Sequence, residues 1–341
     1  MKPTPIANPP NPWASSELEY LDEIPTAKVE IFEDASQTIL STNESPDLGF
    51  RFSVNPYRGC NHACAYCYAR PSHEYLSFGA GTDFDTKIVV KRRAAELLRS
   101  AFDRPSWKGE LVMFSGVTDC YQPLEASLRL TRSCLEVCAE YRNPVSIVTK
   151  APLIERDLDV LQQLHRDASV HVAISIPIWD KTLARAIEPG VATPQRRIQT
   201  IEALARAGIP VGVMVAPIIP GVSDEGMGEV LEAAWNAGAR SAGYVLLRLP
   251  GHVKDVFEVR MKEALPLRAE KILHRVRETR NGKLYDARYG VRGRGEGQYA
   301  EAIAQVFDVT VKRLGFNRDD EWTRVETFRR PVRQAPQLSL F

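Results

Sequence analysis

Six short runs of apolar residues recur along the chain from residue 50 onward. Each run is rich in β-branched residues and almost continuously apolar, a pattern typical of strands that are covered on both faces. The runs are FRFSV (50–54), ELVMFS (110–115), PVSIVT (144–149), VHVAISI (170–176), PVGVMVA (210–216) and AGYVLLR (242–248). We therefore predict six buried strands, separated by segments of a different period.

The segments between these runs show helical patterning. Apolar stripes with a spacing near 3.6 residues predict helices within 123–141, 153–165 and 196–206, and a fourth helix is predicted from Asp224, which can cap it, to Ala237, just before Gly238. Strand and helix alternating this often indicate a parallel sheet with right-handed crossovers. Six strands are two short of a closed eight-fold barrel, so the predicted fold class is α/β, a partial (β/α)6 barrel of the TIM type.

Polar residues gather where the predicted strands end. SGVTD completes the second strand, TK the third and SIP the fourth, while the first strand leads into RGCNHACAYCYAR (58–70). In barrels of this kind, the carboxyl ends of the strands meet at one edge and carry the chemistry. We therefore expect the cysteine-rich loop to lie at the reactive mouth of the barrel.

The two ends of the chain differ from this central region. Residues 1–48 are rich in proline, serine and acidic side chains, and PTPIANPPNP should be extended or disordered. We predict an N-terminal extension, partly disordered, over 1–48 and the barrel over 49–250. A C-terminal cap over 251–330 would help to exclude solvent, and 331–341 would form a flexible tail.

Composition narrows the functional classes. The chain is 44% hydrophobic and 26% charged with a formal net charge of +1, so no global field attracts nucleic acid or membrane. Neither the polar N-terminus nor VGVMVAPIIPGV, the longest apolar stretch, has the pattern of a signal peptide or membrane span. We expect a cytoplasmic protein without a membrane partner, whose six cysteines stay reduced and serve metal ligation or core packing.

Three of the six cysteines, Cys60, Cys64 and Cys67, have the spacing C-x3-C-x2-C. A structural zinc site needs four ligands. An iron–sulfur cube held by three thiolates keeps one iron open for an external ligand. The alternatives are a zinc site completed by His62 or His73, and a non-enzymatic iron–sulfur or zinc scaffold.

This spacing, with Tyr66 ahead of the last cysteine, resembles the radical S-adenosylmethionine (radical SAM) superfamily and its partial barrel. SVNPYRGCNHACAYCYARPSHEYL, SGVTDCYQPLE, TKAPLIERDLDVL and APIIPG resemble the bacterial radical SAM proteins related to spore photoproduct lyase. The resemblance implies an enzyme with a 4Fe-4S cluster and S-adenosylmethionine as cofactors, and an electron donor such as a flavodoxin or ferredoxin. It implies that reductive cleavage of S-adenosylmethionine yields a 5′-deoxyadenosyl radical that abstracts a hydrogen atom.

The resemblance also implies roles for individual residues. Cys60, Cys64 and Cys67 would ligate the cluster. Residues around the mouth would contact S-adenosylmethionine: Tyr66, Ser115, Gly116, Thr118, Asp119, Lys150, Ser175, Glu188, Arg196, Arg197 and Ala216. Of these, Gly116 allows close backbone approach, Lys150 meets the cofactor carboxylate, and one arginine offers a bidentate clamp. The structural alternatives are a solvated Lys150, a core hydroxyl at Ser175 and a surface helix start at the arginine pair.

One departure from the lyase concerns its hydrogen-donating cysteine. In spore photoproduct lyase a cysteine near the end of the second strand returns a hydrogen atom to the substrate radical, and Gly116 stands there in this chain. Cys120 is the candidate catalytic replacement, with a buried, inert thiol as the alternative. Because Gly116 replaces the cysteine of the lyase, we do not expect repair of spore photoproduct.

Cys134 and Cys138 share a helix face. They would pack in the core or, together with Cys120, ligate a second cluster.

Two features favour a nucleic-acid substrate. Residues 271–294 contain eight Lys or Arg and two acidic residues, with Tyr285 and Tyr289 interleaved, which is typical of a nucleotide groove or of a solvated basic face. The last five residues, Gln337, Leu338, Ser339, Leu340 and Phe341, match the pentapeptide by which bacterial DNA-processing proteins bind the sliding clamp, unless the tail folds back on its own barrel. We expect repair or modification of DNA or another nucleic acid; the alternative is a peptide or small-molecule substrate.

Overall fold

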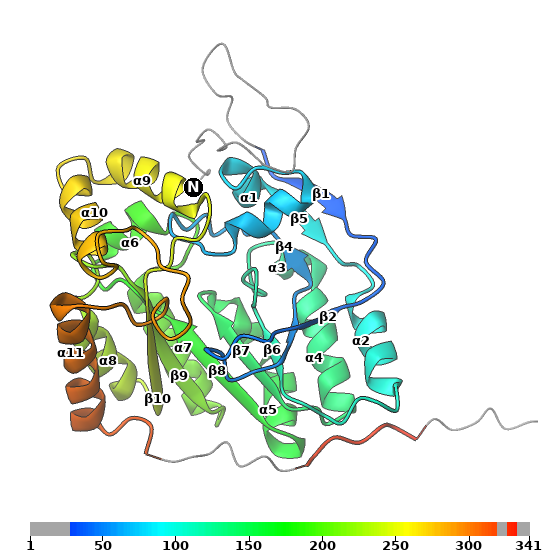
Figure 1. Ribbon diagram of the computed structural model, residues 1–341. Coiled ribbons are helices and arrows are strands. Elements are labelled where there is room, and N and C mark those ends of the chain that lie inside the picture. The colour runs from blue at the N-terminus through cyan, green and yellow to red at the C-terminus, as the bar shows by residue number, and fades with distance from the viewer. Residues whose placement is uncertain (1–27, 319–325, 333–341) are drawn as a thin grey trace, which may run out of the picture.

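A seven-stranded sheet forms the centre of the computed structural model, which describes residues 28–318 and 326–332 (Figure 1). Its strand order is β10-β9-β8-β7-β6-β3-β2, and all neighbours are parallel except the edge strand β2. The strands are β2 (Leu40–Thr42), β3 (Phe52–Val54), β6 (Val112–Phe114), β7 (Val145–Thr149), β8 (Val170–Ser175), β9 (Val211–Ile218) and β10 (Ser241–Leu246). The six predicted strands are thus present in one parallel array, as a partial (β/α)6 barrel requires.

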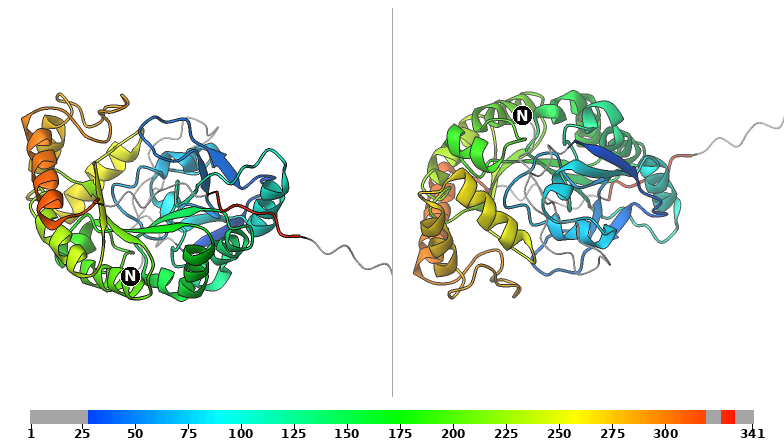
Figure 2. Two further views of the ribbon diagram at one scale, coloured as in Figure 1. Left: turned by 90° about the horizontal axis from the view of Figure 1, so that it is seen from below. Right: turned by 90° about the horizontal axis from the view of Figure 1, so that it is seen from above.

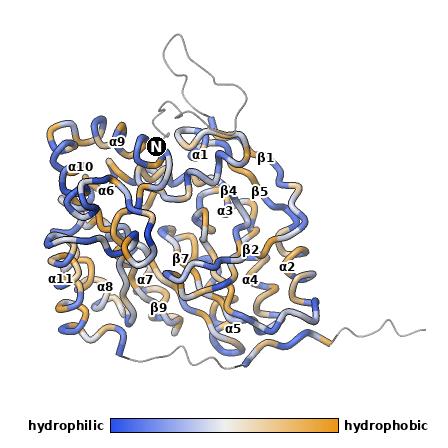
Figure 3. The backbone as a smooth tube through the Cα atoms, viewed as in Figure 1, coloured by the Kyte–Doolittle hydropathy of each residue, from blue (hydrophilic) through white to orange (hydrophobic). Residues whose placement is uncertain are grey.

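Valines meet across successive strands of this sheet. In Cα register, Val112 pairs with Val145, Val145 with Val170, and Val172 with Val211. All five are buried, and Figure 3 shows hydrophobic colouring along the central strands. Because both faces of the sheet are covered, these strands are apolar without alternation. This continuous apolar pattern is the one that predicted the strands from the sequence.

Helices cover the outer face of the sheet, and Figure 2 shows them as an arc around it. They are α2 (Ala94–Asp103), α4 (Leu130–Glu140), α5 (Leu158–Asp167), α7 (Pro194–Arg206), α8 (Met227–Asn236) and α11 (Gln298–Leu314). The helix predicted over 123–141 is broken into α3 (Glu125–Leu128) and α4. Arg129 separates them with a left-handed φ of 52°, a conformation that ends one helix before the next begins.

A second sheet, absent from the sequence-based prediction, has the strand order β1-β5-β4. It consists of β1 (Glu30–Glu33), β5 (Lys87–Val90) and β4 (Tyr57–Arg58). The N-terminal extension contributes to both sheets, since β1 pairs with β5 and β2 with β3. Three of the four β1 side chains are exposed and β4 has two residues, so neither shows the long apolar run that marks a buried strand.

The region after the barrel occupies three places. Helices α9 (Val253–Ala264) and α10 (Ala269–Glu278) share a hydrophobic cluster with the cysteine loop. Helix α11 packs beside β10, where the Phe307 ring lies 4.7 Å from that of Tyr244. Residues 326–332 return to the α2–α4 end, where the backbone N–H of Arg329 donates to the carbonyl of Tyr141. Of the predicted cap, therefore, α9 and α10 are the helices that adjoin the cysteine loop.

Within the two described ranges, every helix is too short or too polar to cross a lipid bilayer. The predicted clamp-binding pentapeptide, 337–341, lies outside the residues that the structure describes. The same holds for residues 1–27 of the N-terminal extension.

We expect His171 to make the fold sensitive to mild acid. Its Nε2 lies 2.7 Å from the Ser241 hydroxyl, and burial lowers the pKa of His171 from 6.5 to about 4. The imidazole of His171 therefore takes up a proton at a higher pH in the unfolded chain than in the folded protein. The contribution of neutral His171 to the free energy of unfolding is present above pH 6.5 and is lost as the pH falls toward 4. The urea midpoint of the wild type should decline more steeply across this window than that of His171→Gln, and parallel curves would contradict the assignment.

Candidate active site

The three cysteines of the C-x3-C-x2-C motif lie on the loop between β4 and the 3-10 helix η1 (Arg70–Leu76). Cys60 and Cys64 are buried, and Cys67 is partly exposed. Cys64 and Cys67 belong to, or pack against, the cluster that includes buried residues of α9 and α10. The loop is therefore enclosed between the barrel and these two helices.

Two glycines allow the cysteine loop to take its path. Gly59 has a φ of +77°, and a Cβ there would lie 2.9 Å from the carbonyl oxygen of Phe84. A Cβ on Gly190, which precedes α7, would lie 2.3 Å from the carbonyl oxygen of Asn61, and the Gly190 N–H donates to the carbonyl of His62 at 3.1 Å. Backbone therefore packs directly on backbone at this point, where a side chain does not fit.

A buried ion network also anchors the cysteine loop through the loop's own backbone carbonyls. The fully buried Asp85 carboxylate accepts hydrogen bonds from Arg70 at 2.8 Å and from Arg260. Arg70 also donates to the carbonyl of Cys64, and Arg260 to the carbonyl of Ala63. Because Arg260 belongs to α9, the cap helps to position the thiols as well as to cover them.

The donor set fits an iron–sulfur cube better than a single ion. Burial raises the pKa of the Cys64 thiol well above its usual value and that of Cys67 to about 11, so ligation must displace their protons. Among residues 28–318 and 326–332, no three Cys, His, Asp or Glu side chains converge on one ion position. His62 Nδ1 instead lies 3.4 Å from Asp119, and His73 Nε2 lies 2.8 Å from a backbone carbonyl. A cube needs one thiolate for each of three irons, and the three thiols of this loop supply that number without a histidine.

The segment after β6 is tied to the cysteine loop by hydrogen bonds. The Gly116 N–H donates to Asn55 Oδ1 at 2.8 Å, and the Gly116 carbonyl accepts from the Tyr68 hydroxyl at 2.8 Å. The Thr118 hydroxyl donates to the carbonyl of Gly59 at 2.7 Å. The structure thus brings the predicted residues Gly116 and Thr118 against the loop that carries the thiols.

Asp119 links this segment to the end of β7. Its Oδ1 accepts from the Thr149 hydroxyl at 2.7 Å and its Oδ2 from the Lys150 N–H at 2.8 Å. Burial alone would raise the pKa of Asp119, but attraction to His62 and these hydrogen bonds lower it to about 2. Asp119 is therefore a buried carboxylate that joins two strand ends.

A charged network adjoins the cysteine loop at Tyr66. The Glu188 carboxylate is 1% exposed and accepts hydrogen bonds from the Tyr66 hydroxyl and from Arg197 at 2.6 Å. Lys150 Nζ lies 5.7 Å from the centre of the Tyr66 ring and has no hydrogen-bond partner among the described residues. Burial alone would lower the pKa of Lys150, but the charges of Cys64 and Glu188 raise it. The ammonium group therefore stays charged beside the thiols with its donors free.

The remaining predicted cofactor contacts are more dispersed. Ser175 ends β8, is buried, and its carbonyl accepts from Arg197 at 2.8 Å. Ala216 is half-buried near the end of β9. Arg196, by contrast, forks onto Glu155 at 2.6 and 2.9 Å, and its side chain is 40% exposed. Of the two neighbouring arginines, Arg197 is the one in the buried network.

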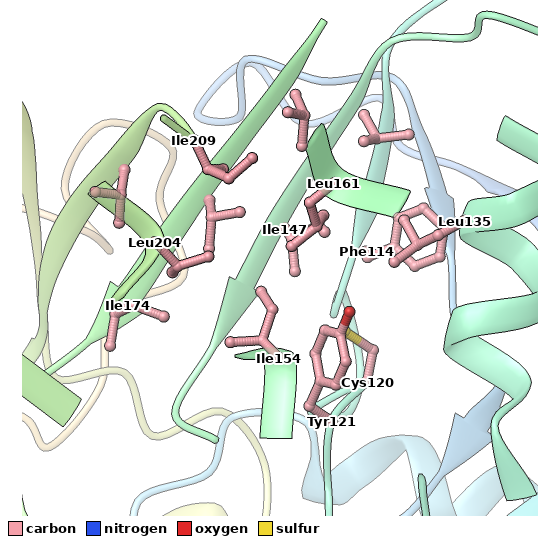
Figure 4. Packing of buried hydrophobic residues seen from close by; sticks show 14 of the residues in the cluster. Phe114, Cys120, Tyr121, Leu135, Ile147, Ile154, Leu161, Ile174, Leu204 and Ile209 are labelled. Carbon is pink, nitrogen blue, oxygen red and sulfur yellow. The ribbon is translucent and has the colours of Figure 1, made fainter. Parts of the chain in front are cut away.

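Cys120, the candidate hydrogen donor, occupies the position of a core thiol, which is the alternative that the sequence left open. Its side chain is fully buried in the main core with Phe114 and Leu135 (Figure 4). Burial raises the pKa of the Cys120 thiol well above its usual value. The backbone N–H of Cys120 donates a hydrogen bond to Ser115 Oγ at 3.0 Å. A thiol that returns a hydrogen atom must meet the substrate, whereas this one packs among apolar side chains.

The proposed second cluster also lacks support in the described residues. Cys134 and Cys138 on α4 are fully buried in the same core as Cys120. These thiols behave as small apolar core residues.

Comparison with known proteins identifies the family. The family model described as the Radical SAM superfamily matches residues 54–234, which is more than half of the chain and includes the cysteine loop. The chain belongs to the radical SAM superfamily. Its cofactors are accordingly a 4Fe-4S cluster and S-adenosylmethionine, and a structural relative, a spore photoproduct lyase variant, is described with bound AdoMet.

Relatives of this radical SAM protein extend across bacteria and archaea. An uncharacterized protein of Mycobacterium tuberculosis is 41% identical over 221 residues, which are 64% of this chain and 65% of that protein, so the match spans less than two thirds of the relative. An uncharacterized protein of Methanocaldococcus jannaschii is 30% identical over 198 residues, 58% of this chain and 71% of that protein. A tyrosine-to-phenylalanine variant of spore photoproduct lyase superposes with a TM-score of 0.59 at 17% identity, covering 84% of this chain and 80% of the lyase. This last likeness shows the shared fold.

Arg248 follows β10 at the edge of the site, and no motif in the sequence marks it as a site residue. Its guanidinium lies 5.5 Å from the centre of the Tyr68 ring, and its Nε is buried without a partner. No ion pair or hydrogen bond engages this side chain within the two described ranges. The only available signal was a charged residue at the end of the last predicted strand, where barrel enzymes place functional groups.

Proposed function

We propose that this radical SAM enzyme acts on a nucleic acid, in a repair or modification reaction. The observation that carries the proposal is the enclosed cysteine loop, with the free Lys150 ammonium beside Tyr66 and the unpaired Arg248 beside Tyr68. When bound, the cluster and S-adenosylmethionine supply reductive cleavage of the sulfonium and so begin hydrogen abstraction. The residues of the chain hold these groups, exclude water and select the substrate.

Roles for the chain's residues follow from their positions. Cys60, Cys64 and Cys67 would ligate three irons. Lys150 would donate to the carboxylate of S-adenosylmethionine, because its ammonium is charged and lacks a hydrogen-bond partner in the described ranges. Gly116 would offer its backbone to the amino group of the cofactor. The network of Glu188 and Arg197 would keep the Tyr66 side of the site rigid and dry.

Two observations support nucleic acid as the substrate class. Unpaired basic side chains lie beside the cysteine loop and in the adjoining cap, and phosphodiesters are bound by such groups. A spore photoproduct lyase structure with a TM-score of 0.57 at 17% identity, covering 83% of this chain and 78% of that one, is complexed with dinucleoside spore photoproduct. Gly116 stands where spore photoproduct lyase has its hydrogen-donating cysteine, and Cys120 is buried, so the reaction of this chain would end differently from that of the lyase.

Deuterium transfer tests the proposal. The reduced, cluster-loaded protein should move deuterium from deuterium-labelled oligonucleotides into 5′-deoxyadenosine, as measured by mass spectrometry. Labelled peptides run in parallel test the alternative substrate class. Transfer from a peptide and none from nucleic acid would contradict the proposal.

Lys150→Ala should weaken the binding of S-adenosylmethionine without loss of iron. A hydrogen bond to a charged group contributes about 1.5–3 kcal/mol, so the dissociation constant should rise about 10- to 100-fold. Equilibrium dialysis of the cluster-loaded protein measures this constant. Lys271→Ala, on the exposed face of α10, is the matched control and should bind normally. Unchanged affinity in Lys150→Ala would identify Lys150 as a solvated lysine.

A further inference from the structure

The basic stretch 271–294 is largely committed to contacts within the protein. Arg280 is buried and donates to the carbonyls of Leu247 and Val291 at 2.8 Å. Arg288 pairs with Asp286 and Glu296, and Arg292 with Asp47. Several cations of this stretch are thus already engaged within the protein, and free cations must be sought one by one.

A cavity of about 280 Å³ opens where this stretch meets the start of α9. Its lining combines apolar, aromatic and cationic residues: Leu249, Gly251, Lys254, Lys283, Leu284 and Tyr285. No acidic side chain lines it, and neither lysine forms an ion pair within the two described ranges. The volume is near the lower end of the range of about 300–1,000 Å³ for small-molecule sites, which suits one nucleotide unit.

Arg248 immediately precedes Leu249, the first residue along the chain that lines this cavity. Three other arginines, Arg70, Arg260 and Arg280, also have a buried Nε without a partner. Each of these three, however, donates through its terminal nitrogens to carboxylate or carbonyl oxygens. Arg248 has no such bond in the described residues, so its planar fork remains available for an oxyanion.

This cationic group adjoins the reaction site. The Arg248 guanidinium stacks over Tyr68, which directly follows Cys67. The Tyr68 hydroxyl is held by the carbonyl of Gly116. A ligand bound by Arg248 would therefore lie beside the cysteine loop, and Lys254 and Lys283 line the cavity that Leu249, the next residue, also lines.

We propose that Arg248, Lys254, Lys283 and Tyr285 form a cap anion site that binds the phosphodiester backbone of a single-stranded or flipped-out segment of the substrate. Arg248 holds the phosphate nearest the reacting nucleotide, the two lysines each hold one of the next two phosphates, and Tyr285 stacks on a neighbouring base. The N-terminus of the 12-residue helix α9 adds its positive dipole to the site. The inference rests on the proposed function, whose substrate class it specifies further.

Salt-dependent binding tests the cap anion site. The full-length, cluster-loaded protein is titrated into a fluorescein-labelled single-stranded oligonucleotide between about 50 and 200 mM salt, with anisotropy as the readout. Lys254→Ala/Lys283→Ala should weaken binding at least about tenfold and should reduce the slope of log K against log salt by about 1.4, or about 0.7 per phosphate contact. Arg248→Gln should reduce the slope by about 0.7.

The matched control removes two exposed lysines elsewhere, in Lys108→Ala/Lys312→Ala, and so keeps the same net charge as the first variant. It should bind like the wild type, and iron content should be equal in all four proteins. If the wild type binds and the cap variants bind equally well with an unchanged slope, the cap anion site is overturned while the proposed function stands. If the wild type does not bind the oligonucleotide, the proposed function fails and the inference fails with it.

Discussion

Asp85→Ala should lower the free energy of unfolding by about 3–5 kcal/mol, because it leaves Arg70 and Arg260 buried without their shared carboxylate. The same change should reduce the iron content of the reconstituted protein. Both arginines also hold carbonyls of the cysteine loop, at Cys64 and Ala63, so a loosened network no longer presents the thiols in one arrangement. Urea denaturation and a colorimetric iron assay measure the two effects.

An exposed ion pair provides the control for this experiment. Glu96→Gln removes a carboxylate that pairs with Arg93 on the surface of α2, where both side chains are 59% exposed. Solvent already screens this pair, so neither the urea midpoint nor the iron content should change measurably. Wild-type stability together with full iron loading in Asp85→Ala would show that the network does not anchor the loop.

Glu188→Ala should be the second most damaging single change. The carboxylate is fully buried, and its removal strands the equally buried Arg197 guanidinium, at a cost of about 3–5 kcal/mol. The substitution also removes the hydrogen-bond acceptor of the Tyr66 hydroxyl. It removes one of the negative charges that raise the pKa of Lys150. We therefore expect a lower urea midpoint and slower formation of 5′-deoxyadenosine.

The neighbouring arginine supplies a matched comparison for this variant. Arg196 pairs with Glu155, but the two side chains are 40% and 27% exposed. Glu155→Ala should therefore cost at most about 1 kcal/mol and leave 5′-deoxyadenosine formation unchanged. Equal losses in Glu188→Ala and Glu155→Ala would contradict the assignment of a special role to the buried pair.

The barrel was predictable from sequence because its strands are covered on both faces. Each of the six apolar runs became a strand, and Val112, Val145 and Val170 now pair across three of them. The second sheet escaped prediction because β1 is mostly exposed and β4 is only two residues long. Short, half-solvated strands are fixed by their partners, which a local pattern does not show.

The site was predictable only in part, for a related reason. The cysteine spacing is local and marked the loop directly, whereas the network that holds it joins Arg70 and Asp85 to Arg260, 175 positions further along the chain than Asp85. Adjacent residues also diverged, since Arg197 entered the buried network and Arg196 turned to Glu155. Such choices depend on tertiary packing, and the burial of Cys120 was fixed in the same way.

The central claim is that three thiolates hold an iron–sulfur cluster that presents one iron to S-adenosylmethionine. Its most direct test is anaerobic reconstitution of the wild type and of Cys60→Ala/Cys64→Ala/Cys67→Ala, followed by metal analysis and reduction in the presence of S-adenosylmethionine. The wild type should bind about four irons per chain and form 5′-deoxyadenosine, and the triple variant should do neither. Zinc in place of iron in the wild type, or equal 5′-deoxyadenosine formation by both proteins, would contradict the claim.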